Sequence, residues 1–513
     1  MPYRSTDHLL KLILRLTPSE KRQLRIQVNK TNVKGNLLFM SLFDHLDKEK
    51  EYDEELIIQK IPGIKRNQLS NLKSSLYRQI LQSLRTTRRS SEVDIGIYEN
   101  IDYATILLSK GMYNASLSIL DKTKKTALEH NNYTAVLAIL EKEKHIESIY
   151  VTGSMYPKAT ELRNETKNIL KLTSLQHSLS SLSLSLYGLY LQYGHVKDQR
   201  DFDFITDFFK NNLPEVEVNK LDFYGKLYYY QSYVWYHHMT QDFANTYRYA
   251  QKWVDLFDEQ PEWKDKESTL YIKGLHNILN PLFLAQRYDK FLVAYEKLVA
   301  FGNERLRLMD RNEESMFKLM EVTHGINRYF LTADFASGVE YVKQVEQFIE
   351  NNTYDWDLNR IMLFNYKIAC IYFCHGDLDH ANLLLNKITN EVYPNFREDI
   401  QCFARLLNLI VHFDLGNESL VTHQVKSTFR FLSKMKHLQK ALQEILSFLR
   451  RLPRIQESHL KNEFKKLRNK LLKIESQQFE RRPFLYLDII AWLDSKIEAI
   501  PVGDVMKRKA GIQ

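Results

Sequence analysis

The stretch that decides the fold runs from Ala369 to Ile388 and reads ACIYFCHGDLDHANLLLNKI. An apolar run is followed by a small turn residue, Gly376, then by a short polar step and a second, leucine-rich amphipathic run. Residues 107–120, LLSKGMYNASLSIL, repeat the same order around Gly111. This order predicts two helices joined by a tight turn.

Related joints recur along the chain at intervals of 40 to 47 residues. A near-constant interval of this size is the sequence signature of stacked helical hairpins. Each hairpin has one face that it cannot bury alone, so neighbours stack into a continuous core and the inner helices line a concave surface. The expected joints are Gly111, Gly153, Gly194, Thr240, Arg287, Ala333, Gly376 and Gly416.

Composition agrees with a helical protein. The chain has 513 residues, of which 44% are hydrophobic and 26% charged, as in ordinary globular proteins. Only 16 glycines and 11 prolines occur, too few for the many turns of an all-β sandwich or barrel. A Rossmann or P-loop core is also unlike this sequence, because each needs glycines at fixed loop positions. Residues 173–183 alternate Ser and Leu, yet we predict a helix there, since a lone strand would leave backbone groups unpaired.

Three joints resemble those of the tetratricopeptide repeat. The interval is longer than the roughly 34 residues of that repeat, which implies lengthened helices. The resemblance implies an all-α, right-handed α-solenoid of stacked helical hairpins, and by analogy a protein-binding scaffold. The alternative is a non-repeating helical bundle, because most joints lack the full motif. The matching residues are Gly376, Asp377, Leu378 and Ala381, then Gly111, Tyr113 and Ala115, and finally Ala333, Phe335 and Ala336.

Charge divides the chain into regions. The net charge is +9 over residues 1–90, −9 over 91–430 and +9 over 431–482. We therefore expect a basic helical N-terminal module at 1–92, helical repeats at 93–435, a basic helical C-terminal cap at 436–499 and a flexible tail at 500–513.

The N-terminal module has the outline of a helix-turn-helix. Thr17 and Glu20 form a capping box that begins one helix. Further helices are expected at 36–48, from about 53, and at 66–85. A short helix, a tight turn and a longer basic helix favour nucleic acid contact, although a capping module with a solvated basic face gives the same outline and is preferred. The candidate contacts are Lys65, Arg66, Asn67, Gln68, Asn71, Lys73 and Arg78.

Residues 223–236, FYGKLYYYQSYVWY, are the most unusual local feature. Their helix would be apolar on every side, which is typical of a central, buried helix. Tyrosine also needs a partner for its hydroxyl group, and Tyr and Trp dominate binding hot spots. One interpretation is therefore a partner-binding groove, and the other is core packing alone. The groove candidates are Tyr229, Tyr233, Tyr236 and Trp235.

The C-terminal basic helix carries Leu460, Phe464, Leu467 and Leu471 on one stripe, with lysine and arginine on the other faces. A helix of this kind is typical of contact with RNA, an anionic surface or an acidic partner. The interpretation that we prefer is a solvated cap. A last helix at about 482–497 should seal the final repeat.

Motifs for catalysis and metal binding are missing from the sequence. It has no Walker A loop, dinucleotide fingerprint, HExxH or GxSxG. Cys370, Cys374 and His375, with Cys402 one repeat later, are the best metal candidate, but buried apolar cysteines are the preferred interpretation. Three cysteines build no disulfide framework, and no window of about 18 apolar residues offers a membrane span, so we expect a cytoplasmic protein without a cofactor or a metal.

The function we expect is a non-enzymatic scaffold that holds a protein or peptide partner in the concave groove of the repeats. The alternative is a nucleic-acid-associated regulator that uses the basic ends. An enzyme is the third class, disfavoured because no site converges. The sequence names neither the partner, the pathway nor the oligomeric state.

Overall fold

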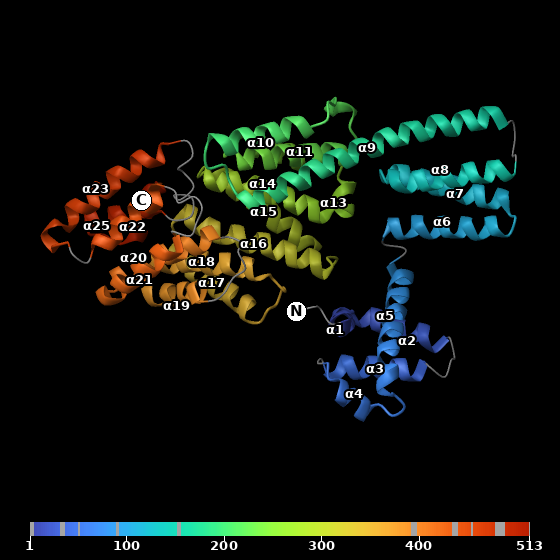
Figure 1. The fold of residues 1–513 in the computed structure, drawn as a ribbon, viewed down its shortest axis with the longest axis horizontal. Helices are drawn as coiled ribbons and strands as arrows, with labels where there is room; N and C mark the ends of the chain where they lie inside the picture. The colour runs from blue at the N-terminus through green and yellow to red at the C-terminus, as the bar shows by residue number, and fades with distance from the viewer. Residues whose placement is uncertain are drawn as a thin grey trace. The chain divides into compact units, whose positions relative to one another are not determined.

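Helices account for all the regular structure in the described residues of the chain (Figure 1). The computed structural model describes residues 5–30, 36–49, 52–88, 92–150, 155–390, 398–432, 440–452, 455–477 and 488–511. No strand occurs within these ranges, so the all-α prediction is confirmed for them. The chain separates into two units, Met1–Ser174 and Leu175–Gln513, and the boundary falls inside helix α9 (Met155–Tyr193).

The first unit begins with five helices around a shared core. Thr17 and Glu20 form the predicted capping box, in which the Glu20 N–H donates to Thr17 Oγ1 over 3.2 Å and the Thr17 N–H donates to Glu20 Oε2 over 2.9 Å. Leu76 and Ile80 of the longest of these helices are buried. The helices are α1 (Ser5–Arg15), α2 (Pro18–Lys30), α3 (Asn36–Glu49), α4 (Glu54–Lys60) and α5 (Arg66–Arg88).

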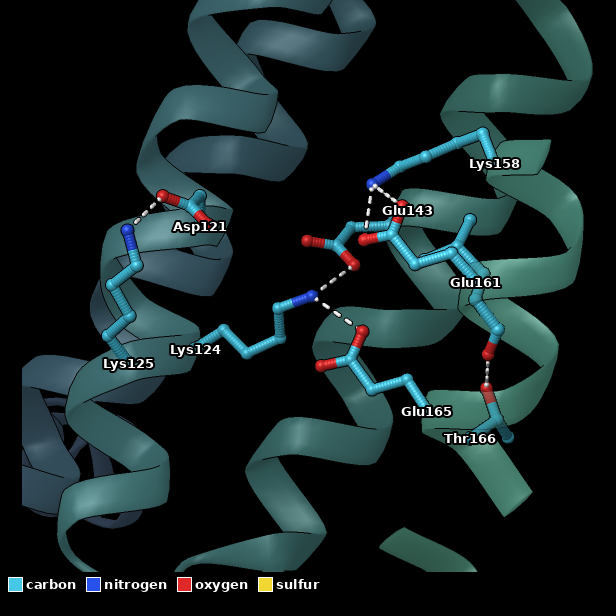
Figure 2. A network of polar contacts seen from close by, with 9 residues as sticks. Asp121, Lys124, Lys125, Glu143, Lys158, Glu161, Glu165 and Thr166 are labelled. Atoms are coloured by element: carbon cyan, nitrogen blue, oxygen red, sulfur yellow. Dashed lines mark hydrogen bonds and ion pairs between the residues drawn. The ribbon is translucent and has the colours of Figure 1, made fainter. Parts of the chain in front are cut away.

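The rest of the first unit stacks α6 (Val93–Ser109), α7 (Tyr113–Glu129), α8 (Tyr133–Ile149) and the first half of α9. A buried ion network joins three of these helices (Figure 2). Lys124 Nζ of α7 lies 2.9 Å from Glu143 Oε2 of α8 and 3.0 Å from Glu165 Oε2 of α9. The side chains of Lys124 and Glu143 are only 12% and 7% exposed, so the charges depend on one another for compensation.

The second unit continues the series of helix pairs. Its first elements are the end of α9, α10 (Gln199–Asn212), the short 3₁₀ helix η1 (Val218–Lys220), α11 (Phe223–Met239), α12 (Phe243–Glu259) and α13 (Glu262–Lys266). Next come α14 (Ser268–Leu284), α15 (Tyr288–Arg305), α16 (Arg311–Thr332), α17 (Phe335–Glu350), α18 (Leu358–His375) and α19 (Leu378–Asn390). The last are α20 (Glu398–Asp414), α21 (Glu418–Leu432), α22 (Lys440–Arg451), α23 (Glu457–Glu475), α25 (Ile489–Glu498) and α26 (Val502–Lys509).

Several turns between paired helices share one geometry. A residue in the left-handed conformation ends the first helix, and the N–H of the next residue donates to a carbonyl five residues back, as in the Schellman motif. An Asn or Asp then often caps the second helix, as Asn132 and Asp242 do. The turns of this kind are centred on Gly111, Asn131, Gln241, Gln286, Asn352, Gly376 and Gly416. They lie at or beside predicted joints, except for Asn131 and Asn352, while the Gly153 joint lies outside the described residues.

Packing follows the order of the chain. Each helix mainly contacts its neighbours in sequence, and α14, α16 and α18 also contact the next helix but one. The first helices of successive hairpins therefore lie beside one another, as stacked hairpins require. The stretch 173–183 is helical within α9, as expected.

The C-terminal end differs from the sequence prediction. Residues 502–509, expected in a loose tail, form α26, because Val505 is fully buried and Gly503 lies against α18. A Cβ on Gly503 would lie 2.6 Å from the Cys374 carbonyl oxygen, so only glycine allows this approach. Arg508 pairs with Glu498 through two bonds of 2.6 and 2.7 Å, which ties α26 to α25. The expected last helix is present as α25 from residue 489, and the part expected at 482–487 lies outside the described residues.

Candidate ligand cavity and binding surfaces

The second unit contains a cavity of about 420 Å³. Residues of α9, α11, α14, α16 and α18 line it, and α26 supplies one wall through Val502 and Met506. The rest of the wall mixes polar and apolar side chains, and Phe283, Phe330 and Phe373 are among the apolar ones. A cavity with apolar lining and convergent polar groups is a usual form of a ligand site.

A chain of polar side chains crosses the cavity wall from α18 to α14. Lys367 Nζ donates to Asn327 Oδ1 over 2.6 Å, and Asn327 Nδ2 lies 3.5 Å from His324 Nδ1. His324 Nε2 lies 2.8 Å from His276 Nδ1, and His276 Nε2 lies 3.0 Å from Asn280 Nδ2. The helices α14, α16 and α18 thus share one chain of polar side-chain contacts.

Both histidines of this chain are neutral at neutral pH. His324 is fully buried, and burial together with the neighbouring His276 and Lys367 holds its pKa well below the usual range. Burial, with the charge of Lys367, lowers the pKa of His276 to about 3. The positive charge of the chain therefore resides on Lys367 alone.

Asp488 is the single carboxylate among the described residues that line the cavity. Its charge is already compensated, because Lys509 Nζ lies 2.9 and 3.1 Å from its two oxygens. Asp488 Oδ1 also accepts the N–H of Ala491 and caps α25.

The surroundings of the cysteines agree with the interpretation preferred from the sequence, in which they pack as small apolar residues. Cys370 and Cys402 are buried, and Cys370 and Cys374 line the cavity. Burial raises the pKa of the Cys370 thiol to about 12, which keeps it protonated at neutral pH. In the described ranges, no group of three or more His, Cys, Asp or Glu side chains is placed to hold a metal ion.

The three groove tyrosines lie away from this cavity. Tyr236 stacks on Phe209 of α10 with ring centroids 4.3 Å apart, and Tyr233 stacks on Tyr249 of α12 at the same distance. The Tyr229 hydroxyl donates to the Tyr233 hydroxyl over 3.2 Å. All three rings are half-buried between α11 and its neighbours, and contact with a partner stays a prediction.

Trp235 faces a different side of α11. Its ring lies 4.7 Å from the Tyr187 ring and 5.5 Å from the Tyr190 ring, both on α9. Tyr190 lines the cavity, whereas Trp235 does not. Trp235 thus packs against Tyr190, a residue of the cavity wall, without lining the cavity itself.

The candidate nucleic-acid contacts are spread over α5 and the turn before it. Lys65, Asn67 and Arg78 are exposed, as are Gln68 and Asn71. Arg66 pairs with Glu54 over 3.6 Å, and Lys73 donates to the Tyr52 hydroxyl over 2.7 Å. Two of the predicted cations are thus engaged within the protein.

Part of the basic face of α23 is also neutralised. Lys466 pairs with Glu463 over 2.6 Å, Lys470 pairs with Glu444 over 2.7 Å, and Arg468 pairs with Asp494. Lys461, Lys465 and Lys473 remain exposed. This pattern fits the solvated cap that the sequence analysis preferred.

The polar chain is not among the site residues predicted from the sequence. A usable signal was present, because His276 precedes Asn280 by four residues and His324 precedes Asn327 by three, on helices one repeat apart. Those spacings put each His and Asn on one helix face. The recurrence of the pair could have indicated a shared polar site.

Comparisons with known proteins give no further guide. The sequence matches no protein-family model, and neither the curated proteins nor the solved structures give a match. Among the helices in the described part of the chain, none combines the length and apolar character needed to cross a bilayer.

Proposed function

We propose that this protein is a non-enzymatic, cytoplasmic scaffold that binds a segment of a partner protein along its inner helices. The observation that carries the proposal is the cavity, because it is built from the inner helices of successive hairpins. Stacked hairpins present their inner helices on one continuous surface, which can hold an extended or helical segment.

The tetratricopeptide resemblance supports a right-handed solenoid as the form of this stack. Its joints supply the tight turns, and the lengthened helices widen each layer. The half-buried aromatic residues of α11 would then extend the binding surface beyond the cavity, since Tyr and Trp are common hot-spot residues.

Site-specific photocrosslinking tests this proposal. A photoreactive phenylalanine replaces Leu363, which lines the cavity from α18, and in a second variant it replaces Leu383, which is 54% exposed on the partner helix α19. Both variants are expressed in the native cell and irradiated. We expect a discrete protein adduct from position 363 and none from position 383.

Two results would count against the scaffold. A protein adduct only from position 383 would place the binding surface on the outer helices. Retention of the purified protein on DNA or RNA at low salt, lost when Lys65, Arg66 and Lys73 are changed to Glu, would instead support the regulator.

A further inference from the structure

The helices α14 and α18 carry positive charge without any carboxylate of their own. α14 contains Lys273, α18 contains Arg360 and Lys367, and neither helix contains Asp or Glu. Their neighbours in sequence differ, because α15 and α17 contain three acidic residues each. The whole stretch 91–430 has a net charge of −9. Two helices of the proposed binding surface are therefore basic within an acidic part of the chain.

Lys273 is the cation of these helices that lacks a partner. No hydrogen bond or ion pair joins its ammonium group to any residue that the structure describes. The side chain is half-buried, so water reaches only part of it. Burial lowers the pKa of Lys273, and the neighbouring charge of Arg360 lowers it further. Both causes act against the charged form of this lysine in the free protein.

Other charged groups of these helices are already paired. Arg360 lies 3.2 Å from Asp357, and Glu321 of α16 lies 2.7 Å from Lys318. Neither pair supplies a carboxylate to Lys273. A partner that brings one would compensate a half-buried charge that the free protein leaves without a counter-ion.

The position of Lys273 places it beside the cavity. It precedes His276 by three residues and Asn280 by seven, and both of these residues line the cavity. Those spacings put Lys273 on the same face of α14, one turn nearer its start. Arg360 has the corresponding position on α18, because it precedes the cavity residue Leu363 by three residues. A basic area thus borders the cavity toward the first turns of α14 and α18.

We propose that the partner segment carries an acidic side chain that pairs with Lys273, next to an apolar side chain that enters the cavity. This inference rests on the proposed function and names the chemistry of the segment. Phe283, Phe330 and Leu363 of the cavity wall suit an aliphatic or aromatic anchor. The acidic side chain fixes the register of the segment, because a positive charge beside Lys273 and Arg360 would be repelled.

Calorimetric titration of full-length variants with the protein recovered from the position 363 crosslink tests this inference. Lys273→Met keeps the apolar stem of the side chain but removes its charge. It should weaken binding at least about tenfold, since a hydrogen bond between two charged groups is lost. Lys343→Met is the matched control, because Lys343 of α17 is half exposed and pairs with Glu340, and it should leave binding unchanged.

A charge exchange then identifies the acidic residue of the partner. Lys273→Glu should weaken binding more than Lys273→Met, because repulsion is added to the lost attraction. The acidic residue of the partner that lies nearest the crosslinked position is changed to Lys in a second step. This change should strengthen binding to Lys273→Glu at least about tenfold and weaken binding to wild type.

Unfolding of the free protein gives a readout that needs no partner. Because the ammonium group of Lys273 is unpaired and half-buried, Lys273→Met should unfold at the same urea concentration as wild type or at a higher one. Tryptophan fluorescence measures this midpoint. A lysine that serves only the stability of the fold would lower the midpoint when it is replaced.

The inference is overturned if Lys273→Met binds the recovered protein as tightly as wild type, or if its urea midpoint is lower than that of wild type. It is also overturned if the charge exchange restores no binding. In each of these cases a protein adduct from position 363 leaves the scaffold proposal intact. Absence of any adduct from position 363 counts against the scaffold, and this inference fails with it.

Discussion

Replacing Glu143 by Ala is expected to destabilise the first unit, because it removes one of the two carboxylates that compensate Lys124 (Figure 2). Lys124 Nζ lies 2.9 Å from Glu143 and is 12% exposed. Burial alone would lower the pKa of Lys124, but hydrogen bonds and charge from Glu143 and Glu165 outweigh it and raise the pKa. The ammonium group therefore depends on these partners to stay charged.

The magnitude follows from the geometry. Removing one partner of a buried ion pair costs roughly 3–5 kcal/mol. Glu165 remains 3.0 Å from Lys124 and is 26% exposed, so part of the compensation survives. We expect a loss of about 2 kcal/mol in the free energy of unfolding of this unit. Asp121→Ala is the matched control: its pair with Lys125 is 56% and 70% exposed, and its loss should cost about 0.5 kcal/mol or less.

Urea denaturation can separate the two units by their chromophores. All five tryptophans, at positions 235, 253, 263, 356 and 492, belong to the second unit, so their fluorescence reports its unfolding alone. Circular dichroism at 222 nm reports both units. Glu143→Ala should therefore shift the unfolding of the first unit, seen by circular dichroism, to a lower urea concentration. The transition seen by tryptophan fluorescence should stay unchanged. A shift no larger than that of Asp121→Ala would refute this account of the network.

Three further predictions concern the second unit. Gly503→Ala should displace α26, because its Cβ would lie 2.6 Å from the Cys374 carbonyl oxygen. The displacement should expose Cys374, so this thiol should react faster with a thiol reagent. Gly188→Ala, where a Cβ meets nothing within 4 Å, should leave the reaction rate of Cys374 unchanged. The pKa of His324 is lowered in the folded state and ordinary in the unfolded state, so the unfolded state binds more protons and the free energy of unfolding should fall as the pH drops below about 6.5. His324→Leu should reduce the change of this free energy with pH by about 1.4 kcal/mol per pH unit. Tryptophan fluorescence in urea at pH 6 and pH 5 measures it. Tyr233→Ala should cost about 2 kcal/mol in the same assay at pH 7, less than a fully buried ring, because Tyr233 is half-buried and stacks on Tyr249; an unchanged midpoint would favour a role in binding instead.

The helices were largely predictable because local signals define them. The capping box at Thr17 and the joint at Gly376 each act through the backbone conformation of a few residues. The joints at Asn131 and Asn352 were missed because they lie only 20 and 19 residues after the joints at Gly111 and Ala333, so a search for intervals of 40 to 47 residues passes over them. The helix at 502–509 was missed because its burial depends on α18, more than 120 residues earlier.

The candidate site was not predicted, for the same physical reason. The polar chain joins α14, α16 and α18, and no single segment of sequence contains more than two of its members. The aromatic segment of α11 attracted attention because it is locally extreme, yet most of its rings pack against neighbouring helices. Composition identifies unusual helices, whereas a cavity depends on which faces the stacking brings together.

We propose that the inner helices of the second unit form the binding surface. Hydrogen exchange of the protein, alone and with the partner recovered from the position 363 crosslink, shows which helices the partner protects. We expect slower exchange in α14, α16 and α18, with no change in α15, α17 and α19. Slower exchange confined to α15, α17 and α19, or to α5 of the first unit, would contradict it.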